Sequence, residues 1–558
     1  MDSIYKKRPW LKNYPEWVPH DLKITPGTAL SDFRASVSRR PEAPAVYYFD
    51  HVITYGEIDR VSNSLAAAFC DLGLSKGDRI ILNLQNVPQF LVALYAAWKL
   101  GAIVVPLNPM YKQNELAYFC QDSGAKVFFT LDEIAKTLDL SFLRKTGIEK
   151  VVTTSPLDML PSESEVPSLL KETRKISVYG TLDMLELLKK YKGKEVNDHG
   201  LSPDDVAYLT YTSGTTGPPK GAMNTHRNIA FNARVYETML RIDENDVVLG
   251  VAPLFHVTGE VAHLAIAALA SIPVVLYYRF DPGETLRLIE RWKVTMIVAS
   301  ITVYIALMNH PDIKKRDISS SVKAYSGGAT VSAAVADQFE KLTGLYIHNV
   351  YGMTETTSPS HMVPWGKRAP VDPESGTLSV GIPVPNSFIK IMDLEGGSQE
   401  VAPGEIGEIV DSGPMVIPGY WKKPEETKHA IRDGWLYTGD VGKMNEDGWF
   451  YVVDRKKDLI NVSGFKVWPR EVEDVLYQHP SIREAAAVGV PDTYRGETVK
   501  AFVALKEGME KSVTPDEIIS FCKARMAAYK YPRVVEIVSE IPKTLTGKFL
   551  RRTLREEK

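Results

Sequence analysis

The strongest chemical signal in the sequence is the segment 212–221, which reads TSGTTGPPKG and follows the strand-like run VAYLTY. Backbone N–H groups in a loop of small hydroxyl residues and glycines can close around phosphate oxygens, and Lys220 adds a positive charge. The segment is not a Walker A loop, because Pro219 stands where that pattern has its second glycine and because two prolines exclude an immediate helix. A glycine-rich surface turn is the simpler alternative, but ten consecutive residues satisfy one demanding pattern. We therefore expect a phosphate-binding loop here.

Six further segments place polar side chains beside glycine or proline along the rest of the chain. They are PLFH at 253–256, SGGA at 326–329, YGMTET at 351–356, YTGD at 437–440, DRKKDLINVSGFKVWPREVE at 454–473 and PKTLTGKFLR at 542–551. Together with the loop, and in this order, they resemble the AMP-forming acyl-adenylate superfamily, which comprises acyl-CoA synthetases, aryl-CoA ligases, beetle luciferases and peptide-synthetase adenylation domains. The resemblance extends over nearly the whole chain, so chance similarity is a poor explanation.

The order of helical and strand-like patterns indicates the fold class. Helix patterns, at 54–72 (which opens with capping-box spacing) and at 87–100 for example, alternate with buried β-rich runs, which is typical of parallel strands in an α/β protein. We expect a large N-terminal α/β domain at 1–454 that ends in a β subdomain at about 360–454, because short alternating strands dominate there. A smaller α+β domain follows at 455–558, and the resemblance implies that it is mobile.

Most of the site residues that the resemblance implies would bind ATP or AMP. They are Thr212, Ser213, Gly214, Thr215, Thr216, Gly217, Lys220, Gly327, Gly328, Ala329, Asn349, Tyr351, Gly352, Thr354, Asp440 and Arg455. The ring of Tyr351 could stack on adenine and Asn349 could hydrogen-bond its exocyclic amine, although core packing is the usual role of a buried tyrosine. Asp440, in a tight turn, could accept hydrogen bonds from both ribose hydroxyls.

The resemblance also implies that Lys548, Thr354 and Glu355 act in the first chemical step. Attack of a carboxylate on the α-phosphorus brings anions together, so a cation held at Lys548 would lower the barrier. Lys543, in the same segment, does not match the family's lysine. Glu355 would bind a Mg²⁺ ion that bridges the ATP phosphates, for which a single carboxylate suffices.

For the acid, the resemblance implies a pocket bordered by His256, Val257, Gly259, Ser326, Gly352 and Met353. Val257 and Gly259 are small and would leave room for an acyl chain. A core or helix-capping role is a strong alternative for His256. No metal-ligand spacing surrounds this histidine, so we do not expect a zinc site.

The implied reaction has two halves. ATP, Mg²⁺ and a carboxylic acid first give an acyl-AMP and pyrophosphate; the C-terminal domain then rotates about Lys457, withdraws Lys548 and admits coenzyme A. Ser463, Gly464 and Lys466 would contact coenzyme A, with Gly464 leaving space for the thin pantetheine arm. No protein nucleophile is required, and the sequence offers no Ser–His–Asp pattern.

The sequence narrows the choice of acid only in part. His256 replaces the aspartate that amino-acid-activating relatives carry after the equivalent phenylalanine, and Gly352 replaces the tryptophan that shortens the pocket of acetate enzymes. A medium- or long-chain fatty acid is therefore favoured, with an aryl acid or a short hydroxy acid such as 4-hydroxybutyrate as the alternative. Two remoter alternatives are a luciferase-type oxidative enzyme and a non-catalytic nucleotide-binding protein.

The composition describes an ordinary globular protein. The chain has 558 residues with 66 basic and 69 acidic side chains, a balance that gives no reason to expect nucleic-acid binding. Three scattered cysteines suit a reducing compartment, so we expect a cytoplasmic protein. The sequence leaves the oligomeric state open, with a homodimer as one possibility. The longest uncharged stretch, Leu264–Tyr278, is too short for a membrane span and is interrupted by Pro273; it predicts a buried helix followed by a strand.

Overall fold

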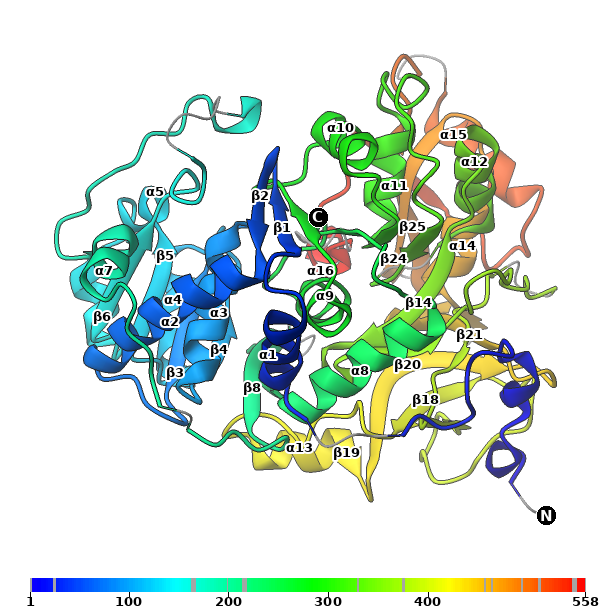
Figure 1. Cartoon of the computed structure of the whole chain (residues 1–558). Coiled ribbons are helices and arrows are strands. Elements are labelled where there is room, and N and C mark those ends of the chain that lie inside the picture. The colour runs from blue at the N-terminus through cyan, green and yellow to red at the C-terminus, as the bar shows by residue number, and fades with distance from the viewer. Residues whose placement is uncertain are drawn as a thin grey trace.

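The computed structural model confirms an α/β protein with two large sheets, a small antiparallel sheet and a further sheet near the C-terminus (Figure 1). In Figure 1 the seven-stranded sheet and its helices lie on the left, and the small antiparallel sheet lies at the bottom in yellow. The structure describes residues 3–23, 27–161, 167–197, 199–212, 218–328, 331–373, 377–455, 458–462, 465–492, 495–509, 513–543 and 549–556.

The seven-stranded sheet has the strand order β7-β6-β5-β3-β4-β8-β9. Its strands are β3 (Arg79–Asn83), β4 (Ile103–Pro106), β5 (Val127–Leu131), β6 (Lys150–Thr154), β7 (Leu182–Asp183), β8 (Val206–Thr212) and β9 (Lys220–Thr225). All neighbours are parallel except β8 and β9, which form an antiparallel hairpin. The segment 212–221 is the turn of this hairpin, at the edge of the sheet.

The nine-stranded sheet has the order β16-β15-β14-β13-β12-β10-β11-β1-β2. Its strands are β1 (Pro44–Tyr48), β2 (His51–Thr54), β10 (Val248–Leu249), β11 (Val274–Leu276), β12 (Met296–Ala299), β13 (Lys323–Ser326), β14 (His348–Met353), β15 (Ser358–Met362) and β16 (Ile382–Pro383). The strands from β1 through β11, β10, β12 and β13 to β14 run parallel, so the carboxyl ends of β13 and β14 lie together. Ligands in such sheets bind beyond the carboxyl ends of parallel strands.

Local sequence signals account for several helices. Helix α2 (Tyr55–Asp71) begins with the expected capping box, in which Thr54 and Glu57 each accept from the other's backbone N–H, and α3 (Pro88–Lys99) begins with a proline. Leu264–Tyr278 forms a buried helix and strand as expected, but the helix begins as a π-helix, η4 (Gly259–Ala265), that continues into α9 (Ile266–Ala270).

The other helices of the N-terminal region are α1 (Ala29–Arg39), α4 (Gln113–Ser123), α5 (Asp132–Ala135), α6 (Leu140–Lys145), α7 (Met184–Lys190), α8 (His226–Met239), α10 (Pro282–Trp292), α11 (Ile301–Met308), α12 (Ala333–Thr343) and α13 (Pro424–Ala430), with the short 3₁₀ helices η1 (Tyr5–Lys7), η2 (Pro9–Asn13), η3 (Ser168–Leu170) and η5 (Thr354–Thr356).

The small antiparallel sheet consists of β17 (Phe388–Met392), β18 (Gly407–Ser412), β19 (Ile431–Arg432), β20 (Trp435–Met444) and β21 (Phe450–Arg455). It therefore begins later than the expected position near residue 360, because β15 pairs with β14, β16 pairs with β15, and both strands extend the nine-stranded sheet instead. The strand type is as expected, since every pairing in this sheet is antiparallel.

The last hundred residues contain a fourth sheet with its own core. Its elements are β22 (Ile460–Val462), β23 (Phe465–Val467), α14 (Pro469–Leu476), β24 (Ile482–Asp492), β25 (Gly496–Leu505), α15 (Pro515–Lys523), β26 (Val534–Val538) and α16 (Arg551–Glu556). Apolar side chains of α14, α15 and the strands pack together in a cluster that contains no residue before Ile460. This separate core confirms a smaller C-terminal domain.

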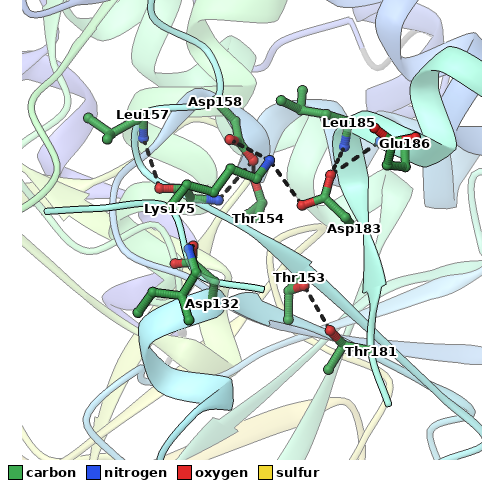
Figure 2. A network of polar contacts seen from close by, with 12 residues as sticks. Asp132, Thr153, Thr154, Leu157, Asp158, Lys175, Thr181, Asp183, Leu185 and Glu186 are labelled. Atoms are coloured by element: carbon green, nitrogen blue, oxygen red, sulfur yellow. Dashed lines mark hydrogen bonds and ion pairs between the residues drawn. The ribbon is translucent and has the colours of Figure 1, made fainter. Parts of the chain in front are cut away.

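A network of ion pairs and hydrogen bonds stabilises the irregular chain between β6 and α7 (Figure 2). Lys175 forms ion pairs with Asp158 and Asp183, both at 2.9 Å, and Asp183 also accepts the first backbone N–H groups of α7. Asp158 further accepts from Thr154 Oγ1 and the Ser155 backbone N–H, each at 2.9 Å.

In the part of the chain that the structure describes, no helix combines the length and apolar character that a membrane span requires.

We expect Asp158→Ala to lower the free energy of unfolding by about 1–3 kcal/mol, because the carboxylate is 2% exposed and its loss leaves the Thr154 hydroxyl and the Ser155 N–H without this acceptor and removes one of the two ion pairs of Lys175. Thermal unfolding followed by circular dichroism measures the change. The matched control is Asp312→Ala, which removes an exposed ion pair to Lys315 and should change stability by less than about 1 kcal/mol. Equal losses in the two variants would contradict this account of the network.

Candidate active site

The segment expected to bind phosphate connects β8 with β9. Thr212 and Lys220 face each other at its base, and Tyr118 Oη donates to the Pro219 carbonyl at 2.6 Å. A strand follows the loop, which confirms that it lacks the helix of a Walker A loop. The loop residues Ser213, Gly214, Thr215, Thr216 and Gly217 lie outside the described residues.

A short strip of chain at 419–421 pairs with β9 directly after the loop. The Trp421 N–H donates to the Gly221 carbonyl at 2.8 Å, and the Met223 N–H donates to the Gly419 carbonyl at 3.1 Å. This pairing places the ring of Tyr420 beside the loop lysine, with Lys220 Nζ 4.6 Å from the ring centroid. The distance is that of a cation–π contact.

The hydroxyl of the same tyrosine reaches the predicted metal ligand. Tyr420 Oη donates to Glu355 Oε1 at 2.7 Å, and the Ile417 N–H donates to the Glu355 carbonyl at 3.0 Å. Burial and the neighbouring carboxylate raise the pKa of Tyr420 well above its usual value, so the phenol stays protonated and remains a donor. Sequence analysis missed Tyr420, because nothing in GPMVIPGYW distinguishes this tyrosine from one that packs in the core.

The surroundings of Glu355 fit a magnesium ion. The carboxylate lies in η5, directly after β14, and is 6% exposed; Thr354 beside it accepts from Asn224 Nδ2 at 3.0 Å through its carbonyl. Among the described residues Oε2 of Glu355 has no hydrogen-bond partner, and no three metal-ligating side chains gather anywhere. Magnesium is commonly held by one carboxylate together with phosphates and waters. Glu355 therefore fits such an ion in the presence of a polyphosphate.

Residues expected to hold the nucleoside also come together. Tyr351 Oη donates to Asp440 Oδ2 at 2.8 Å, and burial raises the pKa of Tyr351 well above its usual value. Asp440 lies opposite Arg455 in the β20–β21 pairing; the side chain of Arg455 lies outside the described part of the chain. The ring expected to stack on adenine and the carboxylate expected to bind the ribose are thus in direct contact.

Among the described residues, two buried polar atoms lack partners where the carboxyl end of β13 lies beside the start of β14. Asn349 Nδ2 donates to the Ser379 carbonyl at 2.8 Å, whereas its Oδ1 has no partner; Ser326 Oγ, on the neighbouring strand and opposite Asn349, has none either. Buried polar atoms in native proteins normally have a partner. The free acceptor on Asn349 therefore suits a ligand donor such as the exocyclic amine of adenine.

The site glycines permit close contacts between backbones. A Cβ atom on Gly352 would lie 1.7 Å from the Ser358 carbonyl oxygen, and one on Gly327 would lie 2.7 Å from the Val350 oxygen. Gly328 has φ +75°, a conformation that favours glycine. Close backbone packing therefore accounts for glycine at positions 327 and 352. Ala329 lies outside the described residues.

The expected acyl-pocket segment is partly structural. His256 Nδ1 accepts from the Thr258 N–H at 3.2 Å, which is the helix-capping role considered as an alternative. A Cβ on Gly259 would lie 2.2 Å from the Pro253 carbonyl oxygen, so the absence of a side chain permits this backbone contact. Val257 is buried and Met353 half-buried.

A buried carboxyl beside this segment was missed. Glu260, in η4, is 1% exposed, and Thr210 Oγ1 donates to it at 3.0 Å. Burial raises the pKa of Glu260 to about 8. Nothing in the run HVTGEVAH distinguishes this glutamate from a solvated one on an amphipathic helix.

The C-terminal segment that carries Lys548 is anchored at both ends. Lys543 Nζ lies 2.6 Å from Glu484, and Lys543 pairs with Phe549 in an isolated antiparallel bridge. Beyond it, Arg551 contacts Glu473 at 2.8 Å and Asp454 at 3.1 Å.

Several predicted residues of the C-terminal domain cannot be placed. Lys548, Lys457, Ser463 and Gly464 lie outside the described residues, as does the side chain of Lys466, whose backbone belongs to β23.

Comparisons with known proteins agree with this geometry. Residues 33–421 match the family model described as AMP-binding enzyme, and residues 471–548 match the model of the AMP-binding enzyme C-terminal domain. The chain is 38% identical to a long-chain-fatty-acid–CoA ligase of Bacillus subtilis (strain 168) over 99% of both chains, and 36% identical to a feruloyl-CoA synthase of Amycolatopsis sp. over 92% of this chain and 96% of that one. The chain therefore belongs to the AMP-binding enzyme family.

Solved structures support the same assignment. The anthranilate CoA ligase AuaEII in complex with anthranoyl-AMP superposes with a TM-score of 0.84 at 27% identity, covering 96% of this chain and 98% of that one. ATP-bound MatB from Rhodopseudomonas palustris superposes with a TM-score of 0.82 at 27% identity, covering 95% and 99%. Within the family, this protein is an AMP-forming acid–CoA ligase, an enzyme that uses ATP and coenzyme A as substrates.

A second missed carboxyl lies beside the nucleoside cluster and provides a test of the site's electrostatics. Asp411, in β18, is fully buried, and among the described residues no partner meets hydrogen-bond geometry with either of its oxygens. Burial raises the pKa of Asp411 to about 7; the nearby Ser360 hydroxyl partly offsets this rise, and the charge of Asp440 adds to it. The native state therefore keeps a proton that the unfolded chain releases, and the stability this proton provides is lost as the pH rises from about 4 to about 7.

We expect Asp411→Asn to stabilise the protein relative to the wild type by an amount that grows with pH, by at most about 1.4 kcal/mol per unit between about pH 4 and 7. The free energy of unfolding of both proteins, measured in denaturant at several pH values, gives the difference. Asp393→Asn serves as the contrast, because backbone N–H groups lower the pKa of Asp393 and its loss should destabilise the protein above pH 4. A difference for Asp411→Asn that is constant with pH would contradict the assignment.

Proposed function

We propose that this enzyme joins medium- or long-chain fatty acids to coenzyme A through an acyl-AMP, and that the residues grouped around Tyr420 and Tyr351 form its nucleotide site. The observation that carries the proposal is the contact of Tyr420 with both Lys220 and Glu355, because it brings a phosphate-binding cation and a metal-binding carboxylate together. Tyr351, which donates to Asp440 of β20, lies on the same β14–η5 segment as Glu355, so one proposed nucleoside contact and the proposed metal ligand follow each other along one stretch of chain.

In the first half-reaction a carboxylate oxygen of the acid attacks the α-phosphorus of ATP, and the bond to pyrophosphate breaks. Asn349, Tyr351 and Asp440 orient the adenosine, while Lys220 and the hydroxyl residues of its loop bind the phosphates. Lys548 neutralises charge on the oxygens of the reacting phosphorus. Glu355 would hold the magnesium ion, which when bound balances the charge of neighbouring phosphate oxygens.

In the second half-reaction the thiolate of coenzyme A attacks the acyl carbon, and the bond to AMP breaks. We infer that the chain divides into domains at 1–454 and 455–558 and that the second rotates about Lys457 to remove Lys548 and present Gly464. The flanks of the proposed hinge support this division, since Asp454 and Asp458 both contact Arg551, at 3.1 and 3.5 Å. Arg551, in the proposed C-terminal domain, thus contacts a residue on each side of the proposed hinge at Lys457.

The fatty acid is favoured over other acids by the relatives, since a second relative at 36% identity, from Escherichia coli O157:H7, is also named a long-chain-fatty-acid–CoA ligase. Because another relative is named a feruloyl-CoA synthase, an aryl acid is the second candidate substrate. We further infer a cytoplasmic enzyme with no nucleic-acid partner, which the near-neutral charge balance supports. Light scattering after gel filtration decides between a monomer and a homodimer.

A panel of acids tests the proposed substrate class. Thioester formation with palmitate or octanoate should exceed that with acetate, ferulate or 4-hydroxybutyrate by at least about tenfold in kcat/KM, because each buried methylene contributes about 0.8 kcal/mol. A preference for ferulate would replace the fatty acid by an aryl acid. Pyrophosphate release without thioester formation would indicate oxidative chemistry, and no pyrophosphate release with any acid would contradict the enzymatic assignment.

The two half-reactions should separate in a Lys548→Ala variant. We expect adenylation, measured by pyrophosphate release without coenzyme A, to fall at least about a hundredfold because the developing charge loses its cation. Thioester formation from supplied acyl-AMP should stay close to the wild-type rate. Lys543→Ala is the control, because this lysine forms an ion pair with Glu484 and should affect mainly stability. Equal damage to both half-reactions in Lys548→Ala would contradict domain rotation.

A further inference from the structure

Tyr420 lies between the two charged groups that face the polyphosphate, and each part of the residue has a different partner. Its hydroxyl donates to Glu355 at 2.7 Å, its ring lies 4.6 Å from the Lys220 ammonium, and its backbone pairs with Ala222 of β9. The side chain is 6% exposed.

The backbone of Tyr420 is fixed from a second direction. Its N–H donates to Thr427 Oγ1 in α13 at 2.9 Å, and Gly419 before it packs so closely on Thr427 that a Cβ would lie 2.6 Å from that side chain. Ile417 and Ala222 pack with the ring in a small apolar cluster. The tyrosine is therefore held by β9 on one side and by α13 on the other, which leaves its hydroxyl little freedom to move away from Glu355.

We propose that Tyr420 is a positioning residue that orients the Glu355 carboxylate for magnesium and fixes its place relative to Lys220. The inference rests on the proposed nucleotide site and adds to it a residue outside the expected set. The hydrogen bond occupies Oε1 and leaves Oε2 available for the ion. Hydrogen bonds to a metal-ligating carboxylate fix its rotamer before the metal arrives, and their loss typically weakens metal binding by about 10–100-fold.

The hydroxyl is tested by Tyr420→Phe, which keeps the ring beside Lys220. The magnesium concentration that half-saturates adenylation should rise about 10–100-fold, while kcat at saturating magnesium recovers toward the wild-type value. Binding of a fluorescent ATP analogue without magnesium should be unchanged, and its tightening by magnesium should be reduced. The second readout does not depend on turnover.

The matched control is Tyr48→Phe, which removes another buried tyrosine hydroxyl, one that donates to the Pro156 carbonyl at 3.0 Å. Its cost in stability should resemble that of Tyr420→Phe, with no change in the magnesium dependence. If Tyr420 has only a structural role, both Tyr420→Phe and Tyr48→Phe should show the magnesium dependence of the wild type.

The ring is tested separately by Tyr420→Leu. Loss of the ring releases Lys220, so this variant should weaken binding of the ATP analogue even without magnesium, unlike Tyr420→Phe. If Tyr420→Leu does not fold, the phenylalanine variant alone decides.

The outcomes separate the inference from the function on which it rests. If the wild type shows magnesium-dependent ATP binding and Tyr420→Phe titrates identically, or binds magnesium more tightly, the positioning role is wrong and the nucleotide site stands. If ATP binding to the wild type does not depend on magnesium, the metal site itself is wrong, and the inference fails with it.

Discussion

The hydrogen-bonded pairing of the strip 419–421 with β9 is the constraint on which the rest of the site depends. It joins three separate parts of the fold: the hairpin at the edge of the seven-stranded sheet, the β14–η5 segment of the nine-stranded sheet, and the connection between β18 and α13. Lys220 and Glu355 belong to different sheets, so the structure of neither sheet alone determines the distance between these two side chains. Tyr420, on the strip, contacts both Lys220 and Glu355. It therefore joins the three elements into one surface, which we propose binds the triphosphate.

The same surface is surrounded by polar atoms that the fold leaves unpaired. Asn349 Oδ1 and Ser326 Oγ lie at the ends of adjacent parallel strands, and Asp411 lies buried beside the nucleoside cluster. An unpaired buried polar atom costs on the order of 1–3 kcal/mol, so a cluster of them marks a place where structure is kept for a ligand. Away from this surface, two buried lysines are paired, Lys323 with Asp246 and Lys99 with Asp59.

Much of the framework could be predicted from the sequence, because it depends on local patterns. The capping box at Thr54, the helix over Pro88–Lys99, the parallel strands and the loop at 212–221 each follow from residues close together in the chain. Tyr420, Glu260 and Asp411 could not be found in this way, since each owes its role to burial or to a partner far along the sequence. The contact that Gly259 permits with the Pro253 backbone could not be predicted for the same reason, because only the folded chain shows it.

The most direct measurement is a crystal structure of the enzyme with Mg²⁺ and a non-hydrolysable ATP analogue. The account predicts the terminal phosphates between Lys220 and Glu355, the metal on the free oxygen of that glutamate, and the adenine beside Tyr351 with its amine on Asn349. Phosphates bound away from the hairpin turn, or a metal held by other side chains while Glu355 faces Tyr420 alone, would contradict it.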